Sequence, residues 1–453
     1  MNSVPREVYE LFHKYGKVMA AQDYPLGPDV KMVLDTEDGV FGTKNGVNFD
    51  NLKWKDIVKM ADGHLSTWKS GMKARVISQT PYCQQCLREG VEFQAVLDDM
   101  AMIVGPEAVI VNMTIPNKKK ASMQMAKAVT NATGFFVQDR IRDGLPAGYT
   151  LTVGRNLYEA VTAMTILEKC AEIALKSRVL GGYKPVGRWK AKQLRSKYME
   201  SYSKAEAEVR SAEMQMHSSV EEEDELEEYE REFYGVKKAE PADAGDAEDT
   251  VCEDSADAAG CPWDEKETQL RQTLVDYGNR LVETGLVQGT WGNLSIRLDD
   301  QYMLVTPSGL DYTRLTAADM VKVHIATQAY EGELKPTSEK GLHAEIYKRR
   351  PDVGAVVHTQ SRYCSIFAAA NQDMPVEDGD AQEVFGTVVR LAKYAGAGTD
   401  KLARNSADAL GDNFGCIMAN HGMLTCGEDM ETAFIHCQLM EQCAGQYIET
   451  RWK

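Results

Sequence analysis

The C-terminal part of the chain begins with apolar residues at helical spacing and then changes to short apolar runs. Residues 270–286 (LRQTLVDYGNRLVETGL) place apolar side chains every three or four positions, which predicts an amphipathic helix. The short runs that follow are bounded by turn residues and predict strands over 294–298, 302–307, 354–359 and 416–427. Helices are expected over 343–350 and from Met430 onwards. This alternation predicts an α/β fold with a mixed or antiparallel sheet covered by helices.

Three segments of the N-terminal part match three C-terminal segments in the same order. The matched segments are 42–60 with 305–323, 73–83 (KARVISQTPYC) with 354–364 (GAVVHTQSRYC), and 150–171 with 423–444. Three collinear matches are hard to explain by chance. They indicate a tandem duplication, so we expect two domains of one fold.

Charged and then small polar residues separate the two parts. Residues 189–232 contain no glycine or proline and predict a long exposed helix. The following AEPADAGDAEDTVCEDSADAAG lacks large apolar residues and is typical of a linker. The expected organisation is a domain over 1–186, a charged helix over 187–234, an acidic disordered linker over 235–264 and a second domain over 265–453.

Most of the formal net charge of -17 lies at this boundary. Residues 219–265 hold 19 acidic and 3 basic side chains, a charge of -16, so the remainder of the chain is nearly neutral. Nucleic-acid binding needs a concentrated basic face, so no nucleic-acid partner is expected. A solvated helix end followed by a disordered linker explains the acidic run better than an acidic docking tail does.

Hydropathy and cysteine usage favour a soluble cytoplasmic protein. No apolar run approaches the roughly 20 residues of a membrane span, and the first 22 residues carry charges throughout. The ten cysteines are unclustered except for Cys83 and Cys86, which does not resemble a secreted disulfide framework. The CQQC pair is compatible with a redox or zinc half-site, but no second CxxC exists, and a structural role is the favoured reading.

Polar turns of the C-terminal part are suited to binding an anion. They are GTWGNLSIR over 289–297, TPSG over 306–309 and PTSEKG over 336–341. Hydroxyl groups and free backbone N–H groups in such turns can cradle a phosphate or carboxylate. Each turn alone is more often an ordinary turn or helix cap. Arg297 and Lys340 are the nearest cations, so a carboxylate or neutral polar substrate fits as well as a phosphate.

Two histidines, His358 and His421, end apolar strands. Gln360 follows His358 by two positions, and alternation along a strand points both side chains the same way. A lone histidine at a strand end is more often structural than a ligand. His343 and His436 lie in helical patterns, and we expect structural roles for both.

The ordered set GTxGNxSxR, TPxG, a hydroxyl pair followed by Glu, HxHxxxC and NHG resembles the class II aldolase/adducin family, the L-fuculose-phosphate aldolase-like proteins. The resemblance covers nearly all of residues 265–453. It implies that Glu339 is the catalytic acid/base and that His358 and His421 are two of three metal-binding histidines. Gln360 occupies the third metal position. The implied substrate- or anion-binding positions are Asn293, Ser308, Gly309, Thr337 and Ser338.

The glutamine at position 360, in place of a histidine, affects which metal ion the site would prefer. The family holds Zn²⁺ with three imidazoles, whereas the neutral amide oxygen of Gln360 suits harder cations such as Mn²⁺ or Mg²⁺ better. The expected cofactor is a divalent metal ion, Mn²⁺ or Zn²⁺ before Mg²⁺ or Fe. Glu339 can complete the ligand set, and so can the acidic loop of Asp378, Asp380 and Glu383, which reads more often as a solvated loop.

The N-terminal copy lacks most of these residues. It has Ile77 and Gly148 at the positions of His358 and His421, and its spacing omits the GTWGN and TSE segments. We therefore expect a degenerate aldolase-like domain that replaces a subunit in a homo-oligomer and contributes side chains to an active site at a domain or subunit border. Candidates for such contributions are Tyr82, Arg140 and Arg142, for which surface roles are the plainer reading.

The resemblance implies a metal-dependent carbon–carbon bond-cleaving enzyme, an aldolase-type lyase. It would act through an enolate or enediolate on a small carbonyl or sugar-phosphate substrate. The same intermediate serves a related metal-dependent hydrolase, dehydratase, epimerase or decarboxylase acting on a dicarbonyl or hydroxy-carbonyl compound. A non-catalytic adducin-like assembly protein is the alternative of another class.

Overall fold

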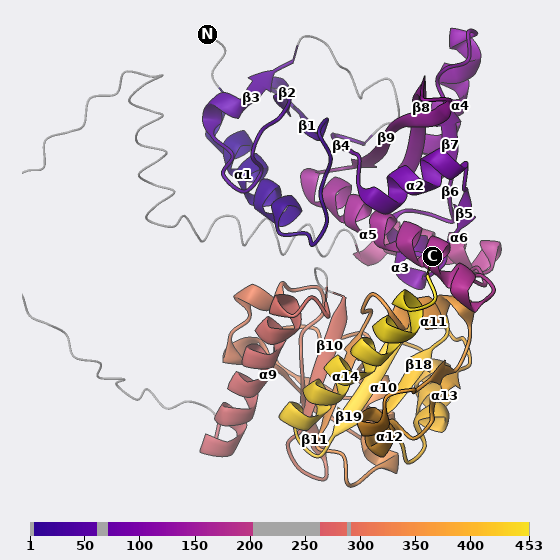
Figure 1. Cartoon of the computed structure of the whole chain (residues 1–453). Helices are drawn as coiled ribbons and strands as arrows, with labels where there is room; N and C mark the ends of the chain where they lie inside the picture. Colours follow the sequence, from indigo (N-terminus) through magenta and orange to yellow (C-terminus); the bar gives the residue numbers. More distant parts are fainter. Residues whose placement is uncertain (1–3, 61–70, 203–262, 288–290, 453) are drawn as a thin grey trace, which may run out of the picture.

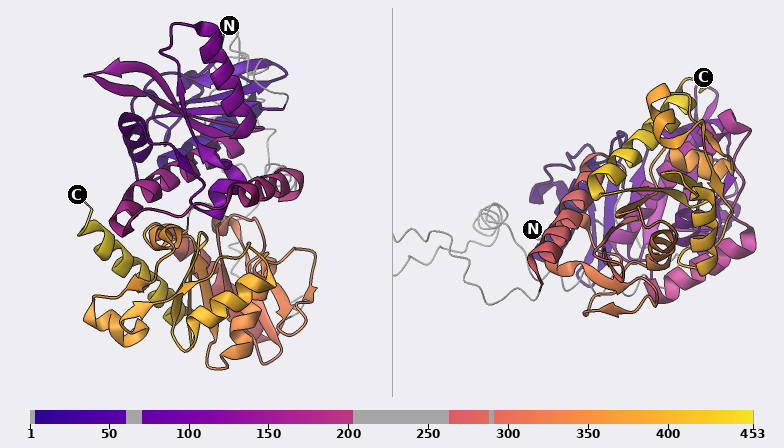
Figure 2. Two further views of the ribbon diagram at one scale, coloured as in Figure 1. Left: turned by 90° about the vertical axis from the view of Figure 1, so that its right-hand side faces the viewer. Right: turned by 90° about the horizontal axis from the view of Figure 1, so that it is seen from below.

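The computed structural model describes residues 4–60, 71–202, 263–287 and 291–452, which form two halves (Figure 1). Each half is a sheet with helices packed against it, and Figure 2 shows the halves stacked on one another. The linker 235–264 and most of the helix predicted over 187–234 lie outside the described residues. Among the helices that are described, none is long and apolar enough to cross a membrane.

The N-terminal half is built on a seven-stranded mixed sheet in the order β3-β2-β1-β4-β9-β8-β7. Its strands are β1 Lys31–Thr36, β2 Gly39–Thr43, β3 Ile57–Lys59, β4 Ala74–Ser78, β7 Ile110–Asn112, β8 Gly134–Arg142 and β9 Leu145–Gly154, with β5 Phe93–Gln94 and β6 Glu107–Ala108 forming a separate pair. Its helices are α1 Arg6–Ala20, α2 Pro81–Glu89, α3 Asp98–Ile103, α4 Lys118–Asn131, α5 Leu157–Lys176 and α6 Arg188–Lys197, with short turns η1 Trp54–Asp56, η3 Ser177–Leu180 and η4 Tyr198–Tyr202.

The C-terminal half is built on an eight-stranded mixed sheet in the order β13-β12-β11-β10-β14-β19-β18-β17. Its strands are β10 Gly292–Arg297, β11 Tyr302–Val305, β12 Val321–His324, β13 Tyr330–Glu331, β14 Ala355–Thr359, β17 Leu391–Ala392, β18 Gly415–Met418 and β19 Gly422–Gly427, with β15 Met374–Pro375 and β16 Val388–Val389 forming a separate pair. Its helices are α9 Glu265–Glu283, α10 Lys340–Arg349, α11 Cys364–Ala370, α12 Gly379–Phe385, α13 Asp400–Leu410 and α14 Met430–Glu449, with turns η5 Tyr312–Arg314 and η6 Ala317–Asp319. The predicted α/β class with a mixed sheet is confirmed.

The two sheets have the same order of pairings. The series β3-β2-β1-β4-β9-β8-β7 corresponds position by position to β12-β11-β10-β14-β19-β18-β17. In each sheet the last two strands are parallel and the remaining pairs are antiparallel. The matched segments 73–83 and 354–364 cover β4 with the start of α2 and β14 with the start of α11. The sequence matches therefore fall on strands that occupy equivalent places.

A continuous apolar core joins the halves. Helices α3 and α5 of the N-terminal half share one buried cluster with α11 and α14 of the C-terminal half. Ion pairs border this core: the Arg362 guanidinium lies 2.5 Å from a Glu172 oxygen, and Lys176 pairs with Glu449. Because this core is shared, α3 and α6 are held against the strand ends that carry His358 and His421.

The pairing of β14 with β19 and the glycine at position 422 bring those strand ends close together. Strand β14 pairs with β19, and His358 lies opposite Leu424. At the start of β19, a Cβ atom on Gly422 would lie 2.4 Å from the Thr359 carbonyl oxygen, so glycine is needed for this close approach. The strand register therefore depends on the glycine of the NHG motif.

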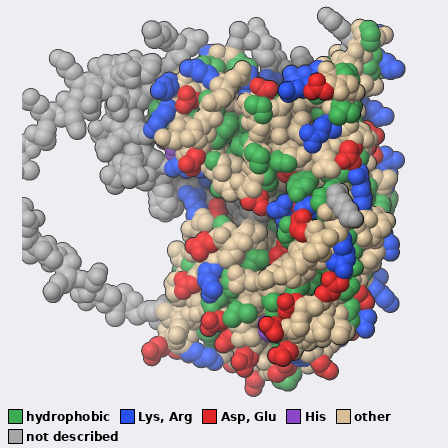
Figure 3. Space-filling view, in the orientation of Figure 1, with side chains coloured by type: hydrophobic (Ala, Val, Ile, Leu, Met, Phe, Trp, Pro, Cys, Tyr) green, Lys and Arg blue, Asp and Glu red, His purple; other side chains and the backbone are tan. Residues whose placement is uncertain are grey.

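The visible surface is mixed in charge, and the CQQC cysteines are buried. On the face shown in Figure 3, Lys and Arg side chains are interspersed with Asp and Glu over both halves. Cys83 and Cys86 are buried free thiols of α2, and burial raises the pKa of Cys86 to about 12. A thiol with so high a pKa is protonated at neutral pH, so this pair packs the interior instead of presenting a reactive thiolate.

Candidate active site

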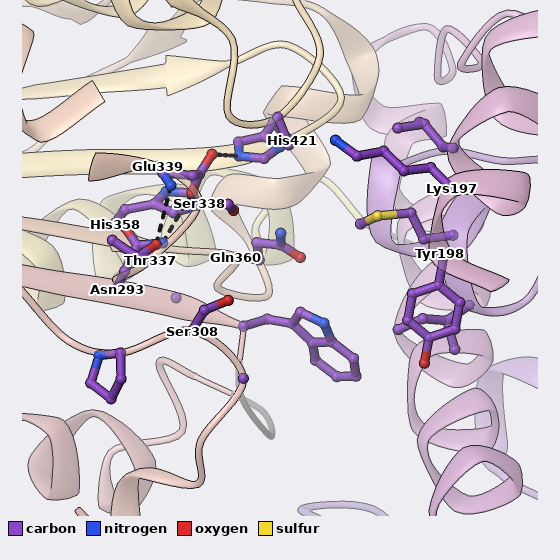
Figure 4. A pocket seen from close by; sticks show the side chains of 18 residues that line it. Lys197, Tyr198, Asn293, Ser308, Thr337, Ser338, Glu339, His358, Gln360 and His421 are labelled. Atoms are coloured by element: carbon purple, nitrogen blue, oxygen red, sulfur yellow. Dashed lines mark hydrogen bonds and ion pairs between the residues drawn. The ribbon is translucent and has the colours of Figure 1, made fainter. Parts of the chain in front are cut away.

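A pocket with a cavity volume of about 150 Å³, open to solvent, lies between the halves (Figure 4). Its C-terminal side carries Glu339, His358, Gln360 and His421 together with the polar turns. Its N-terminal side carries residues of α3, α6 and η4, which face the polar side from across the pocket. Those N-terminal residues are Met102, Ile103, Leu194, Lys197 and Tyr198.

Glu339 lies at the centre of the polar side. It immediately precedes α10, and its carboxylate is almost completely buried. One carboxylate oxygen lies 2.7 Å from His421 Nε2, and the other lies 3.1 Å from His358 Nε2. The amide of Asn293 donates a hydrogen bond of 3.0 Å to that second oxygen. One carboxylate therefore connects the two histidines predicted from the sequence.

The two imidazoles lie parallel and turn the same nitrogen towards Glu339. Their ring centroids are 5.0 Å apart, with an angle of 2° between the planes. His358 Nδ1 lies 2.7 Å from the Met423 carbonyl oxygen, and a carbonyl can only accept a hydrogen bond. His358 Nδ1 therefore carries the proton, which leaves a lone pair on Nε2 towards the pocket.

Mutual charge sets the protonation of this cluster. Burial by itself would raise the pKa of Glu339, but the adjacent His358 and His421 hold that pKa well below its usual range. Burial would lower the pKa of His421, but the Glu339 carboxylate, with Asp98 nearby, raises it to about 10. Burial lowers the pKa of His358 below its usual value. The cluster without a bound ion is a Glu339 carboxylate paired with a His421 imidazolium, beside a neutral His358.

A buried hydrogen-bond chain supports Glu339 from beneath. Ser295 Oγ lies 2.6 Å from His343 Nδ1, and His343 Nε2 lies 2.5 Å from the side-chain oxygen Oδ1 of Asn293. Burial lowers the pKa of His343 to about 3, so this ring is neutral and donates through Nε2. His343 thus has a structural role, as expected: it orients the Asn293 amide towards Glu339.

The polar turns meet at the pocket floor. Thr337 N donates to the Thr306 carbonyl oxygen at 3.1 Å, and Ser308 N donates to the Lys335 carbonyl oxygen at 2.9 Å. Ser308, Gly309, Thr337 and Ser338 all line the pocket with Asn293, so the structure brings the predicted substrate-binding positions together. Figure 4 shows Ser308 and Ser338 on the side of the pocket that carries Glu339.

The geometry fits a divalent metal ion. Ligand atoms of Glu339, His358 and His421 all lie within 4.8 Å of one another, so these three side chains are close enough to bind one ion together. The Gln360 side chain lines the same pocket, and its carbonyl oxygen is buried without a hydrogen-bond partner among the described residues. A buried oxygen of this kind is suited to a cation, so the four residues fit the expected ligand set.

Other sequence candidates lie elsewhere. Within the described ranges, the acidic loop does not join the metal-ligand group, and Asp378 instead accepts a hydrogen bond from Ala381 N as the N-cap of α12. Arg297 donates to three backbone carbonyl oxygens and does not face the pocket turns.

Of the N-terminal candidates, Tyr82 contacts Arg362 at the junction of the halves but does not line the pocket. Arg140 and Arg142 lie on the exposed end of β8 beside Asp139 and Asp143.

The sequence predicts that the N-terminal half borders the site, but not which of its residues line the pocket. The expectation of a site at a domain border agrees with the arrangement, but none of the N-terminal residues that line the pocket was named from the sequence. They lie on short helices outside the matched segments, and apolar residues at helical spacing look like ordinary core. No spacing signal in the sequence distinguishes them.

Comparison with known proteins agrees with this geometry. Residues 272–448 match the model of the Class II Aldolase and Adducin N-terminal domain. The 5-deoxy-D-ribulose 1-phosphate aldolase of Bacillus thuringiensis serovar kurstaki is 33% identical over 40% of this chain and 85% of its own length. The 5-methylthioribulose-1-phosphate/5-deoxyribulose-1-phosphate aldolase of Rhodospirillum rubrum is 35% identical over 39% of this chain and 80% of its own length.

A solved L-fuculose 1-phosphate aldolase is 35% identical, covers 40% of this chain and 86% of its own chain, and gives a TM-score of 0.39. The two curated relatives align over 85% and 80% of their own lengths, and the range that the family model matches, residues 272–448, contains Glu339, His358 and His421. The chain therefore belongs to the class II aldolase and adducin family and is an enzyme of the class II aldolase type, a lyase.

Proposed function

We propose that the protein is a metal-dependent aldolase that cleaves a phosphorylated ketose whose far end is apolar. The observation that carries the proposal is the coupling of Glu339 to His358 and His421 on one side of a pocket bordered by hydroxyl-bearing turns. His358, His421 and Gln360, with Glu339, would hold a divalent metal ion, Mn²⁺ or Zn²⁺ before Mg²⁺ or Fe. When bound, such an ion polarises a substrate carbonyl as a Lewis acid.

Glu339 is the group placed to move protons. A retro-aldol cleavage needs a base that takes the proton of the hydroxyl group on the departing carbon, and an acid that returns a proton to the enolate carbon. The paired imidazolium lowers the basicity of Glu339. Metal binding requires a neutral His421, so the proton that weakens Glu339 leaves as the site becomes loaded.

The two sides of the pocket suit the two ends of such a substrate. Ser308, Thr337 and Ser338, with Gly309 and Asn293, provide hydroxyl, amide and backbone N–H donors for a phosphate. On the opposite side, Met102 and Leu194 provide an apolar wall for a methyl or thioether end. Two relatives are named for 5-deoxy and 5-methylthio ribulose phosphates, which have this form.

We further infer that the N-terminal half is a degenerate second copy of the domain. Its support is the three collinear sequence matches together with the shared order of the sheets. The domain boundaries predicted above, 1–186 and 265–453, follow this division. We propose that this copy takes the place of a neighbouring subunit beside the site, and that the whole chain still assembles as a homo-oligomer.

The test is an assay of the full chain with 5-deoxyribulose 1-phosphate, ribulose 1-phosphate and 5-deoxyribulose, each with added Mn²⁺ or Zn²⁺. The expected result is cleavage between C3 and C4 of the phosphorylated sugars, fastest for the deoxy sugar, with little cleavage of the unphosphorylated one. Binding without cleavage would direct the search to dehydration, hydrolysis or decarboxylation. If no metal binds and no substrate raises the melting temperature, an assembly role would replace the enzymatic proposal.

A further inference from the structure

The N-terminal half places a buried carboxylate behind His421. Asp98 is the first residue of α3, and both it and His421 are almost completely inaccessible to solvent. Asp98 Oδ2 lies 3.7 Å from His421 Nδ1, on the side of the ring away from Glu339. The carboxylate comes from one half and the imidazole from the other.

Asp98 is held at this position by bonds between the halves. Its backbone N–H donates to the Asn420 carbonyl oxygen at 2.9 Å, immediately before His421. The Asn420 amide donates in return to the Val96 carbonyl oxygen at 2.8 Å. The hydroxyl group of Tyr394 donates to Asp98 Oδ1 at 2.7 Å, which leaves Oδ2 directed at His421.

The facing atoms are each without another partner. Neither Asp98 Oδ2 nor His421 Nδ1 makes a hydrogen bond within the described part of the chain. Buried polar atoms without partners are costly, so two such atoms that face each other indicate an interaction that forms when the site is organised. A shift of well under 1 Å would bring the 3.7 Å separation into hydrogen-bond range.

Each of the two histidines then has a hydrogen-bond acceptor behind its Nδ1 atom. His358 is oriented by the Met423 carbonyl oxygen at Nδ1, which leaves its Nε2 towards Glu339. His421 also turns Nε2 towards Glu339, and the acceptor behind its Nδ1 is the Asp98 carboxylate. Metal-binding histidines usually donate their second N–H to a carboxylate or carbonyl oxygen, which fixes the tautomer and the ring orientation.

We propose that Asp98 is a positioning residue for the metal site: it accepts the Nδ1 proton of His421 and thereby presents Nε2 to the ion. This inference rests on the metal site of the proposed function. It makes the N-terminal half a part of that site, although this half supplies no residue to the predicted ligand set.

The test is direct titration of the metal-free full chain with Zn²⁺ against a competing chelator, for wild type, Asp98→Asn and Asp98→Ala. Loss of a carboxylate behind a metal-binding histidine typically weakens metal affinity by about 10–100-fold. We expect Asp98→Ala to lose about that much. Asp98→Asn retains a carbonyl oxygen as an acceptor, so we expect its affinity to lie between those of Asp98→Ala and wild type.

The matched control is Glu172→Gln. Glu172 is another buried N-terminal carboxylate at the junction of the halves, but its partners are Arg362 and Lys176, and it does not line the pocket. We expect this variant to lower the unfolding temperature and leave Zn²⁺ affinity within about twofold of wild type, because it loses an ion pair without touching the site. Tyr394→Phe, which frees Asp98 Oδ1 without removing the carboxylate, should weaken Zn²⁺ binding less than Asp98→Ala does.

The outcomes separate the two proposals. If wild type binds Zn²⁺ and the folded Asp98 variants bind it equally well, the role of Asp98 is wrong and the metal site stands. If Glu172→Gln weakens binding as much as Asp98→Ala does, general loosening of the junction explains the effect and the specific role is wrong. If wild type binds neither Zn²⁺ nor Mn²⁺, both proposals fail.

Discussion

At the scale of single residues, the proposed function gives Glu339 two roles that compete. Without an ion, its carboxylate neutralises the His421 imidazolium; in the proposed reaction, it would carry protons for a substrate. The neutral His343 and the amide of Asn293 fix one of its oxygens, so the carboxylate has little freedom to turn away. Its activity is therefore tied to the protonation of His421.

Glu339→Gln should lower kcat by about 10²–10⁴-fold, because an amide of the same shape cannot take up or return a proton. Steady-state rates with 5-deoxyribulose 1-phosphate measure this. Glu345→Gln is the matched control, since Glu345 lies on α10, the helix that Glu339 precedes, and pairs with Arg349 at the surface. Unchanged turnover in Glu339→Gln would remove Glu339 from the chemistry.

Metal affinity should rise with pH. The pKa of His421 is raised to about 10, so at neutral pH a proton occupies the nitrogen that the ion needs. Binding therefore releases about one proton per ion, and affinity should rise by about tenfold per pH unit between pH 6 and 8. Mn²⁺ titration calorimetry in buffers of different ionisation enthalpy measures the proton release. An affinity independent of pH over this range would contradict the ion pair.

The same pKa predicts the stability of the ion-free protein. A folded-state pKa above the unfolded value means that the imidazolium form stabilises the fold fully below the usual histidine pKa, and that this contribution is lost as pH rises towards about 10. Urea unfolding from pH 6 to 10 measures the loss. His421→Gln, which cannot titrate, should lack this part of the pH dependence, and an identical pH profile in that variant would contradict the assignment.

At the scale of elements, the site depends on how closely β14 and β19 approach. His358 ends one strand and His421 precedes the other, so their separation follows from the register of this pair. Gly422 keeps the pair tight because its missing Cβ would meet the Thr359 carbonyl oxygen.

Gly422→Ala should lower the free energy of unfolding by about 1–3 kcal/mol, since a methyl group must force two packed strands apart. We also expect weaker metal binding, because the strand ends carry the histidines. Gly379→Ala is the control, as a Cβ there meets nothing within 4 Å. Urea unfolding and metal titration measure the two effects, and a Gly422→Ala variant with wild-type values in both would contradict this role.

The sequence predicted these elements better than it predicted the residues that pack against them from the other half. Apolar periodicity located α9, β14 and α14, because burial of one face or of a whole strand leaves a pattern in consecutive residues. The histidines, Glu339, Gln360 and the hydroxyl-bearing residues on the C-terminal side of the pocket were also named, since a set of short motifs carries them. Asp98 and the apolar wall could not be named, because their roles arise from packing between segments that are far apart in sequence.

At the scale of the whole molecule, the pocket is closed by both halves of one chain. The shared core, the Arg362–Glu172 ion pair and the α3 contacts with Asn420 hold the N-terminal half over the strand ends of the C-terminal half. The N-terminal half, which supplies none of the predicted metal ligands, thus contributes the opposite side of the pocket. The complete pocket therefore requires both halves.

The fragment 260–453 should be less soluble than the full chain and have little or no activity. It retains the predicted ligands but loses the wall residues and Asp98, and it exposes the apolar residues of α11 and α14 that now pack against α3 and α5. Size-exclusion chromatography and the cleavage assay measure both effects. A monodisperse fragment with full activity would show that the N-terminal half is dispensable.

The most direct measurement is element-resolved metal analysis of the purified full chain beside His358→Ala and His421→Ala. The account predicts about one Mn or Zn ion per wild-type chain and substantial loss in both variants, each of which remains folded by circular dichroism. A wild-type chain that holds no ion after incubation with Mn²⁺, Zn²⁺, Mg²⁺ or Fe²⁺, or variants that retain the full amount, would contradict the central claim that Glu339 and the two histidines form a metal site.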